Sequence, residues 1–129
     1  MNQNLIMNCI TFSKNYLTKH PEYIKKGYLH FSFIVVDNKI IERGFNRSTN
    51  PPIHYGYPER SKLHSEIQAW IHARGLINGS KFEILNVRLN RTCQIRISKP
   101  CVYCFDLLSA LGCKAFYYTT NEGTIECIN

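Results

Sequence analysis

The sequence predicts an α/β fold in which a single mixed β-sheet is sandwiched by helices. Segments rich in β-forming residues alternate with segments whose apolar residues recur at helical spacing. Turn-forming Gly, Pro and Asn residues separate them. The 129 residues are 44% apolar and 19% charged, which predicts one domain over 1–129 with a single core. The expected order is α-β-β-α-β-α-β-β, as helix 5–18, strands 29–36 and 39–45, helix 63–76, strand 82–89, helix 101–111, and strands 115–119 and 124–128.

The N-terminal half is expected to form a helix, a hairpin and a long loop. His20-Pro21 ends the first helix, because the residue before a proline avoids the helical conformation. Asp37-Asn38 makes the turn between the first two strands, which therefore pair as a hairpin. Residues 46–62 contain three prolines and form a loop of a length that is usually functional or disordered in small domains.

Glycines and a short turn define the C-terminal half. Gly75 and Gly79 mark the end of the second helix, and Gly112 closes the third. Asn121-Glu122-Gly123 is long enough only for a tight turn, so the last two strands should run antiparallel.

Composition limits the partners and the compartment. A net charge of +7 favours a phosphate-bearing or polyanionic partner. No window approaches 18 consecutive apolar residues, and the N-terminus lacks the pattern of a signal peptide, so we expect a cytoplasmic protein that does not span a membrane. Its cysteines are then reduced, and Cys9, Cys113 and Cys127, in apolar surroundings, are expected to be buried thiols.

Two short motifs carry the chemistry. They are His64-Ser65-Glu66 and Pro100-Cys101-Val102-Tyr103-Cys104, and each opens a predicted helix after a loop. Each alone is a weak match, but together and in this order they match H-x-E…P-C-x-x-C, the signature of zinc-dependent nucleobase deaminases.

The spacing suits a catalytic zinc site. His64, Cys101 and Cys104 supply three ligands for Zn²⁺, and a catalytic site leaves its fourth position open. Helix N-termini stabilise the thiolates of both cysteines. Glu66 is expected to take a proton from the attacking water and to deliver it to the ring nitrogen beside the attacked carbon.

On these motifs the chain resembles the cytidine/deoxycytidylate deaminase superfamily, from the first strand pair to the fourth strand. Gly44-Phe45-Asn46-Arg47 is similar to the family's G-x-N segment, and the resemblance implies a cytidine deaminase-like fold and a substrate contact by Asn46. A histidine as the first ligand is typical of the nucleotide, tRNA and polynucleotide branches. Antiparallel last strands are instead typical of the free-nucleoside branch and of several bacterial toxin deaminases. The two features favour different branches, so the resemblance does not decide to which branch of the superfamily the chain is most similar.

Basic residues gather in the loops before the two ligand-bearing helices, and aromatic residues lie in the first of these loops and at the start of the third helix. They suit phosphate groups and stacking on a base. The basic residues are Arg47, Arg60, Lys62, Arg91, Arg96 and Lys99. The aromatic residues are Tyr55, Tyr57, Tyr103 and Phe105.

We therefore expect a zinc-dependent hydrolytic deaminase that converts cytosine to uracil in a nucleotide or a single-stranded nucleic acid. The alternatives are a tRNA-type adenosine deaminase, a free-nucleoside deaminase, and an inactive zinc-stabilised nucleic-acid-binding module. A further alternative is an interaction protein with a structural zinc that Cys93 completes as a fourth ligand. Small members of the family often form dimers or tetramers, and this analogy leaves a homo-oligomeric state open.

Overall fold

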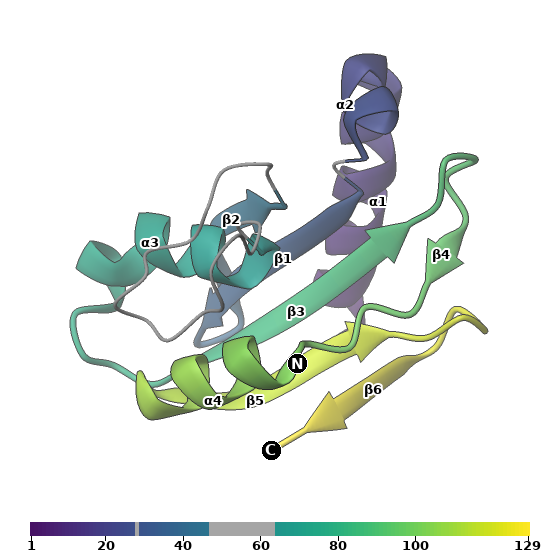
Figure 1. Ribbon diagram of the computed structural model, residues 1–129. Coiled ribbons are helices and arrows are strands. Elements are labelled where there is room, and N and C mark those ends of the chain that lie inside the picture. Colours follow the sequence, from purple (N-terminus) through teal and green to yellow (C-terminus); the bar gives the residue numbers. More distant parts are fainter. Residues whose placement is uncertain (28, 47–63) are drawn as a thin grey trace.

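The computed structural model describes residues 1–27, 29–46 and 64–129 (Figure 1). In these segments the chain forms four helices and one open mixed sheet of six strands, as the α/β prediction requires. The helices are α1 (Gln3–Lys19), α2 (Pro21–Lys26), α3 (Ser65–Ile77) and α4 (Val102–Ala110). The strands are β1 (His30–Val36), β2 (Lys39–Phe45), β3 (Phe82–Leu89), β4 (Ile95–Arg96), β5 (Cys113–Thr119) and β6 (Ile125–Ile128).

The sheet has the order β2-β1-β3-β5-β6, and β4 pairs with β3. Strand β1 runs antiparallel to β2 and β3, whereas β3 and β5 are parallel and are connected through α4. Asp37 and Asn38 turn β1 into β2 with positive φ angles of 52° and 60°, the backbone that a two-residue hairpin needs. Strands β5 and β6 are antiparallel, so the predictions from both turns are confirmed.

Two apolar layers cover the two faces of this sheet (Figure 1). Side chains alternate along a strand, so neighbouring residues face opposite layers. In β1, Phe31 and Phe33 pack in the cluster that holds α1, whereas Ile34 packs in the cluster that holds α3 and α4. In β3, Ile84 faces α3 and α4, and Leu85 faces α1. The face under α3 and α4 is the one that carries both sequence motifs.

Two short elements were not predicted. Pro21, which ends α1, also starts α2, because its fixed φ suits the first position of a helix and its missing N–H has no intrahelical partner there. Gly27 ends α2 with a φ of 75°. The two-residue strand β4 lies in the expected loop before α4. Elements this short have too few residues to show a hydrophobic period, which is why the predicted order lacks them.

All six cysteines are free of disulfides. Cys9 and Cys113 are buried, as predicted, and burial raises the pKa of each thiol to about 12. The prediction for Cys127 is wrong, because this residue is exposed on the edge strand β6. In the described part of the chain, no helix has the length and apolar character needed to cross a membrane.

Candidate metal centre

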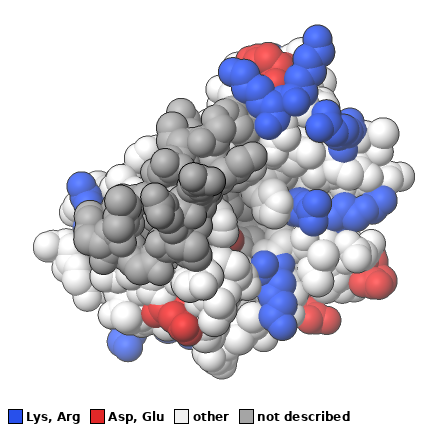
Figure 2. All heavy atoms as spheres, in the orientation of Figure 1, with Lys and Arg blue, Asp and Glu red and all other residues white. Residues whose placement is uncertain are grey.

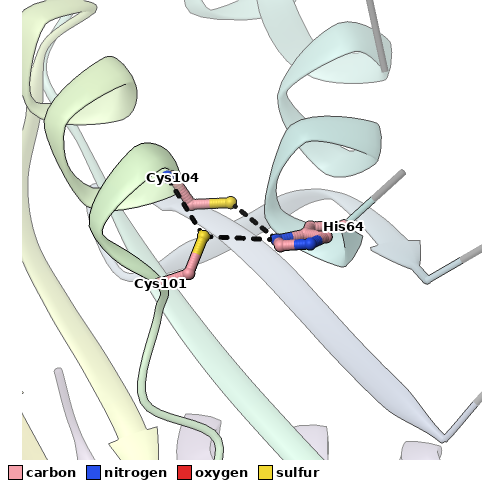
Figure 3. A group of neighbouring side chains, drawn as sticks. All are labelled: His64, Cys101 and Cys104. Carbon is pink, nitrogen blue, oxygen red and sulfur yellow. Dashed lines mark hydrogen bonds between the residues drawn. The ribbon is translucent and has the colours of Figure 1, made fainter. Parts of the chain in front are cut away.

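The starts of α3 and α4 bring three potential metal ligands together (Figure 3). His64 is the N-cap of α3, Cys101 is the N-cap of α4, and Cys104 lies in the first turn of α4. Their ligand atoms all lie within 4.8 Å of one another. The His64 Nδ1 atom is 3.2 Å from the Cys104 sulfur and 3.4 Å from the Cys101 sulfur. Two segments far apart in the sequence therefore meet at one point.

The donor set suits zinc. One imidazole nitrogen and two thiolate sulfurs bind Zn²⁺ tetrahedrally with bonds of about 2.0–2.3 Å, which places neighbouring donors about 3.6 Å apart. The two nitrogen-to-sulfur distances are close to that spacing. Among the residues described, no fourth His, Cys, Asp or Glu joins the group, and Cys93 packs instead against the core cluster around α1. Three protein ligands are typical of a catalytic rather than a structural zinc site.

Hydrogen bonds prepare Cys101 for a cation. The pKa of the Cys101 thiol is lowered to about 4, and the largest cause is its side-chain hydrogen bond with Cys104. Burial raises this pKa, whereas His64 and the hydrogen bond from the Cys104 backbone N–H lower it further. The hydrogen bond to Cys101 raises the pKa of His64, against the effect of burial. Because a metal takes neutral imidazole, its binding is expected to displace a proton from His64.

Glu66 lies beside the three ligands and is only 6% exposed. It is in the first turn of α3, two residues after His64. Burial raises the pKa of its carboxyl, and hydrogen bonds and the charge of His64 oppose the rise in part. The Asn86 side-chain NH₂ donates to Glu66 Oε1 at 2.6 Å, which holds the carboxyl in place. A buried carboxyl with a fixed orientation is the kind of group that transfers protons in an active site.

A buried polar network continues from Asn86 into the sheet. The Ser32 hydroxyl donates to Asn86 Oδ1 at 2.6 Å and lies 2.7 Å from the Ser65 hydroxyl. The Asn86 NH₂ also donates to the Ser98 carbonyl at 3.1 Å, and the Ser98 hydroxyl donates back to the Asn86 carbonyl at 2.8 Å. In the described part of the chain, every buried side-chain nitrogen and oxygen has a partner. The network therefore ties the start of α3 to β1, β3 and the segment before α4.

Gly44 lets α3 approach the sheet. A Cβ atom at this position of β2 would lie 2.5 Å from the Ala69 nitrogen and 2.8 Å from the Ser65 carbonyl oxygen. Only glycine allows the helix backbone to pass so close to the strand. The predicted G-x-N segment thus has a packing role that fixes the height of His64 and Glu66 above the sheet.

These residues border a pocket of about 290 Å³, which is lined by His30, Asn46, His64, Ser65, Glu66, Lys99 and Cys101. His30 was not singled out from the sequence. Burial, followed by the charges of Arg88 and His64, lowers the pKa of His30 to about 4, so its imidazole is neutral near pH 7. Two of the three potential ligands, the Glu66 carboxyl and the predicted substrate contact Asn46 therefore share one pocket.

The predicted substrate contacts fall into three groups. Asn46 lines the pocket, and its side chain also accepts from the His30 backbone N–H and donates to the Gly27 carbonyl. Tyr103 lies on α4, is 47% exposed, and is not among the lining residues. The remaining contacts, Arg47, Tyr55 and Tyr57, with Arg60 and Lys62, lie outside the described residues.

The sequence reasoning missed the residues that support Glu66. A signal for two of them was present, since Ser32 and Asn86 are polar positions inside strands of otherwise apolar residues. A polar residue that is buried in a strand needs a hydrogen-bond partner, so each pointed to a network on this face.

Comparison with known proteins finds no family model that matches the chain and no curated protein with a significantly similar sequence. The description of the site therefore stands on the chain's own residues. They form an α/β fold with a His and Cys-x-x-Cys cluster that could bind zinc, in agreement with the deaminase motif.

Proposed function

We propose that the protein is a zinc-dependent hydrolytic deaminase with a cytidine deaminase-like fold. Its reaction replaces the exocyclic amine of cytosine with oxygen, in a nucleotide or a single-stranded nucleic acid, and consumes water and releases ammonia. One observation carries the proposal: a cluster of one imidazole and two thiols lies beside a buried carboxyl, and His64, Cys101 and Glu66 line the same pocket.

His64, Cys101 and Cys104 would hold the ion, and a bound zinc supplies a Lewis acid that makes water nucleophilic near neutral pH. Glu66 accepts the proton of the attacking water and delivers it to the ring nitrogen beside the attacked carbon. The Glu66 carboxylate then takes the remaining proton of the hydroxyl that was added to the carbon and delivers it to the departing amine. The C–N bond breaks, the amine leaves as ammonia, and the C–O bond becomes the carbonyl of uracil. The raised pKa of Glu66 suits these deliveries, because it favours the protonated form.

Asn86 acts on this step through Glu66. Its NH₂ group donates to Glu66 Oε1, and the carboxyl also has hydrogen bonds with its own backbone N–H and with Cys104. The Asn86 amide is in turn fixed by Ser32 and Ser98, so the carboxyl cannot rotate without breaking buried hydrogen bonds. Asn86 is therefore a positioning residue.

Three further lining residues of the pocket are proposed to contact the substrate. Asn46 and the neutral His30 offer hydrogen-bonding groups to a base or a sugar, and Lys99 offers a positive charge. Contacts by Arg47, Tyr55, Tyr57 and Tyr103 stay predictions, as do the identity of the base and a homo-oligomeric state.

A zinc-stabilised nucleic-acid-binding module is the second candidate, favoured by the net charge of +7. Glu66 separates the two candidates. A binding module gives no reason for a buried carboxyl beside an open metal site, and it would bind oligonucleotides equally well with or without that carboxyl.

The test incubates the zinc-loaded protein with cytidine, dCMP, single-stranded DNA and RNA, and measures uracil and ammonia. Glu66→Gln should keep the metal and lose turnover. Glu122→Gln is the matched control, because Glu122 is an exposed carboxylate in the turn before β6 and should leave turnover unchanged. Full turnover in Glu66→Gln, or no metal uptake by the wild type, would contradict the proposal.

A further inference from the structure

A row of basic residues crosses the sheet at the mouth of the pocket. His30 lies opposite Arg88 in the β1–β3 ladder, and Arg88 lies opposite Arg96 in the β3–β4 ladder. Residues directly opposite one another in antiparallel strands point to the same face. Two positions earlier in β3, Asn86 contacts Glu66 of α3, so this face carries the metal centre. The basic row therefore lies on the side of the sheet that holds the site.

The site face changes character along β1 and β3. Ile34 lies opposite Ile84 in the core beneath the helices. Ser32 lies opposite Asn86 in the next row, where the polar network supports Glu66. The basic row comes next, at the end of the strands. A ligand whose base lies in the pocket beside Glu66 and His30 would extend its outer part towards the basic row.

The arginine pair is not explained by stability. Like charges that lie directly opposite one another in a sheet are destabilising. Among the described residues, neither Arg88 nor Arg96 nor Lys99 forms an ion pair. The Arg96 guanidinium donates to the Ile95 carbonyl and to the Gln94 side chain, which uses two of its five N–H donors. The arginines of the row therefore carry positive charge that no carboxylate of the described residues offsets. An external anion would offset this charge.

Lys99 connects this row with the pocket. It is exposed, lines the pocket, and lies two residues before Cys101. Figure 2 shows Lys and Arg side chains gathered on the side of this face that α2 and the β3–β4 region form. The positive charge therefore lies beside the pocket opening.

We propose that Arg88, Arg96 and Lys99 form a subsite for a phosphate group of the substrate, at the edge of the pocket that takes the base, where Lys99 is the one of the three that lines the pocket. This inference rests on the proposed function. Guanidinium groups present paired N–H donors that match phosphate oxygens, and the lysine ammonium adds a point charge. The phosphate comes from a mononucleotide or from the backbone of a single strand, and the chemistry of recognition is the same.

The test measures binding by the zinc-loaded chain in the Glu66→Gln background, so that turnover does not consume the ligand. The probes are deoxycytidine, dCMP and a single-stranded octanucleotide that contains C and A. Arg88→Gln/Arg96→Gln changes two subsite residues that do not line the pocket, and it is compared with Lys39→Gln/Lys114→Gln, which removes two exposed charges at the opposite end of the sheet. Melting temperatures establish that both double variants fold.

The site variant should bind a phosphate-bearing probe at least ten-fold more weakly and deoxycytidine equally well, while the control variant binds all probes like the parent. If the octanucleotide is the preferred probe, the slope of log K against log salt should fall by about 1.4 for two lost contacts. A preference for dCMP identifies a terminal phosphate as the source, and a preference for the octanucleotide identifies the backbone.

Equal affinities of the parent for phosphate-bearing and phosphate-free probes would overturn the subsite. So would an equal loss in both double variants. The proposed function fails separately: an arginine-dependent preference for phosphate in a wild-type protein that releases no ammonia refutes deamination and keeps the subsite. Ammonia release from deoxycytidine, with no effect of Arg88→Gln/Arg96→Gln on the binding of any probe, supports deamination and refutes the subsite.

Discussion

Gly44→Ala should destabilise the protein and weaken its metal centre together. The added Cβ would lie 2.5 Å from the Ala69 nitrogen, whereas ordinary contacts begin at 3.4 Å, so α3 must retreat by about 0.9 Å or the strand must bend. Both clashing atoms belong to the α3 backbone, which cannot rotate away as a side chain would. Overpacking of this kind costs about 1–3 kcal/mol, and we expect the upper half of that range.

The matched control is Gly75→Ala in the same helix. Gly75 is exposed, and a Cβ there would meet nothing within 4 Å. Alanine in a helix interior is more favourable than glycine by about 0.5–1 kcal/mol, so this variant should be stabilised. The same chemical change thus has opposite effects at two positions, which separates packing from any general effect of adding a methyl group.

The assay is thermal and urea unfolding of both variants, with zinc and with a chelator. For a chain of this length, 1 kcal/mol shifts the melting temperature by about 4 °C. Gly44→Ala should lose about 8–12 °C and bind zinc more weakly, because α3 carries His64 and Glu66. A Gly44→Ala protein as stable as the wild type, or two variants that shift in the same direction, would refute the reasoning.

Three further predictions follow from buried groups. Asn86→Ala leaves its polar partners unpaired and should lower the free energy of unfolding by about 1–3 kcal/mol in urea, and turnover by about 10²-fold with zinc content unchanged; unchanged turnover would contradict its positioning role. The pKa of His30 is about 4 in the fold and about 6.5 in the unfolded chain, so between these pH values the imidazole is protonated only in the unfolded chain. The free energy of unfolding therefore falls as the pH falls from about 6.5 to about 4, by up to about 1.4 kcal/mol per pH unit. His30→Gln should flatten the curve relative to wild type, and parallel curves would argue against a neutral buried imidazole. An alkylating reagent at pH 8 should modify exposed Cys127 in the native protein, but Cys9 and Cys113 only after unfolding; mass spectrometry that finds early labelling of either buried thiol would contradict the fold.

Local sequence signals predicted most of the fold and the ligands of the site. Strands β2 and β3 have the predicted bounds, because turn-forming residues lie at both ends of each strand. His64 and Cys101 both cap helices, and caps are local features that a loop-to-helix transition shows in the sequence. The convergence of the two helix starts was inferred from chemistry, and the geometry agrees with it.

The supporting network could not be read from local signals. Ser32 lies opposite Asn86 only because β1 and β3 are neighbours in this register, and the chain order alone does not state that β3 inserts between β1 and β5. The basic row was also not visible in the sequence, because Arg88 and Arg96 lie opposite each other only through the pairing of β3 with the unpredicted strand β4. The role of Gly44 also needed the fold, because its close contact is with a helix some twenty residues later in the chain.

X-ray absorption at the zinc edge of the loaded wild-type chain tests the centre most directly. We expect about one zinc per chain, bound to two sulfurs at about 2.3 Å and to one imidazole nitrogen, with the fourth position filled by an exchangeable light atom. Spectra that show four protein ligands, or that lack the two sulfurs, would contradict a catalytic metal held by His64, Cys101 and Cys104.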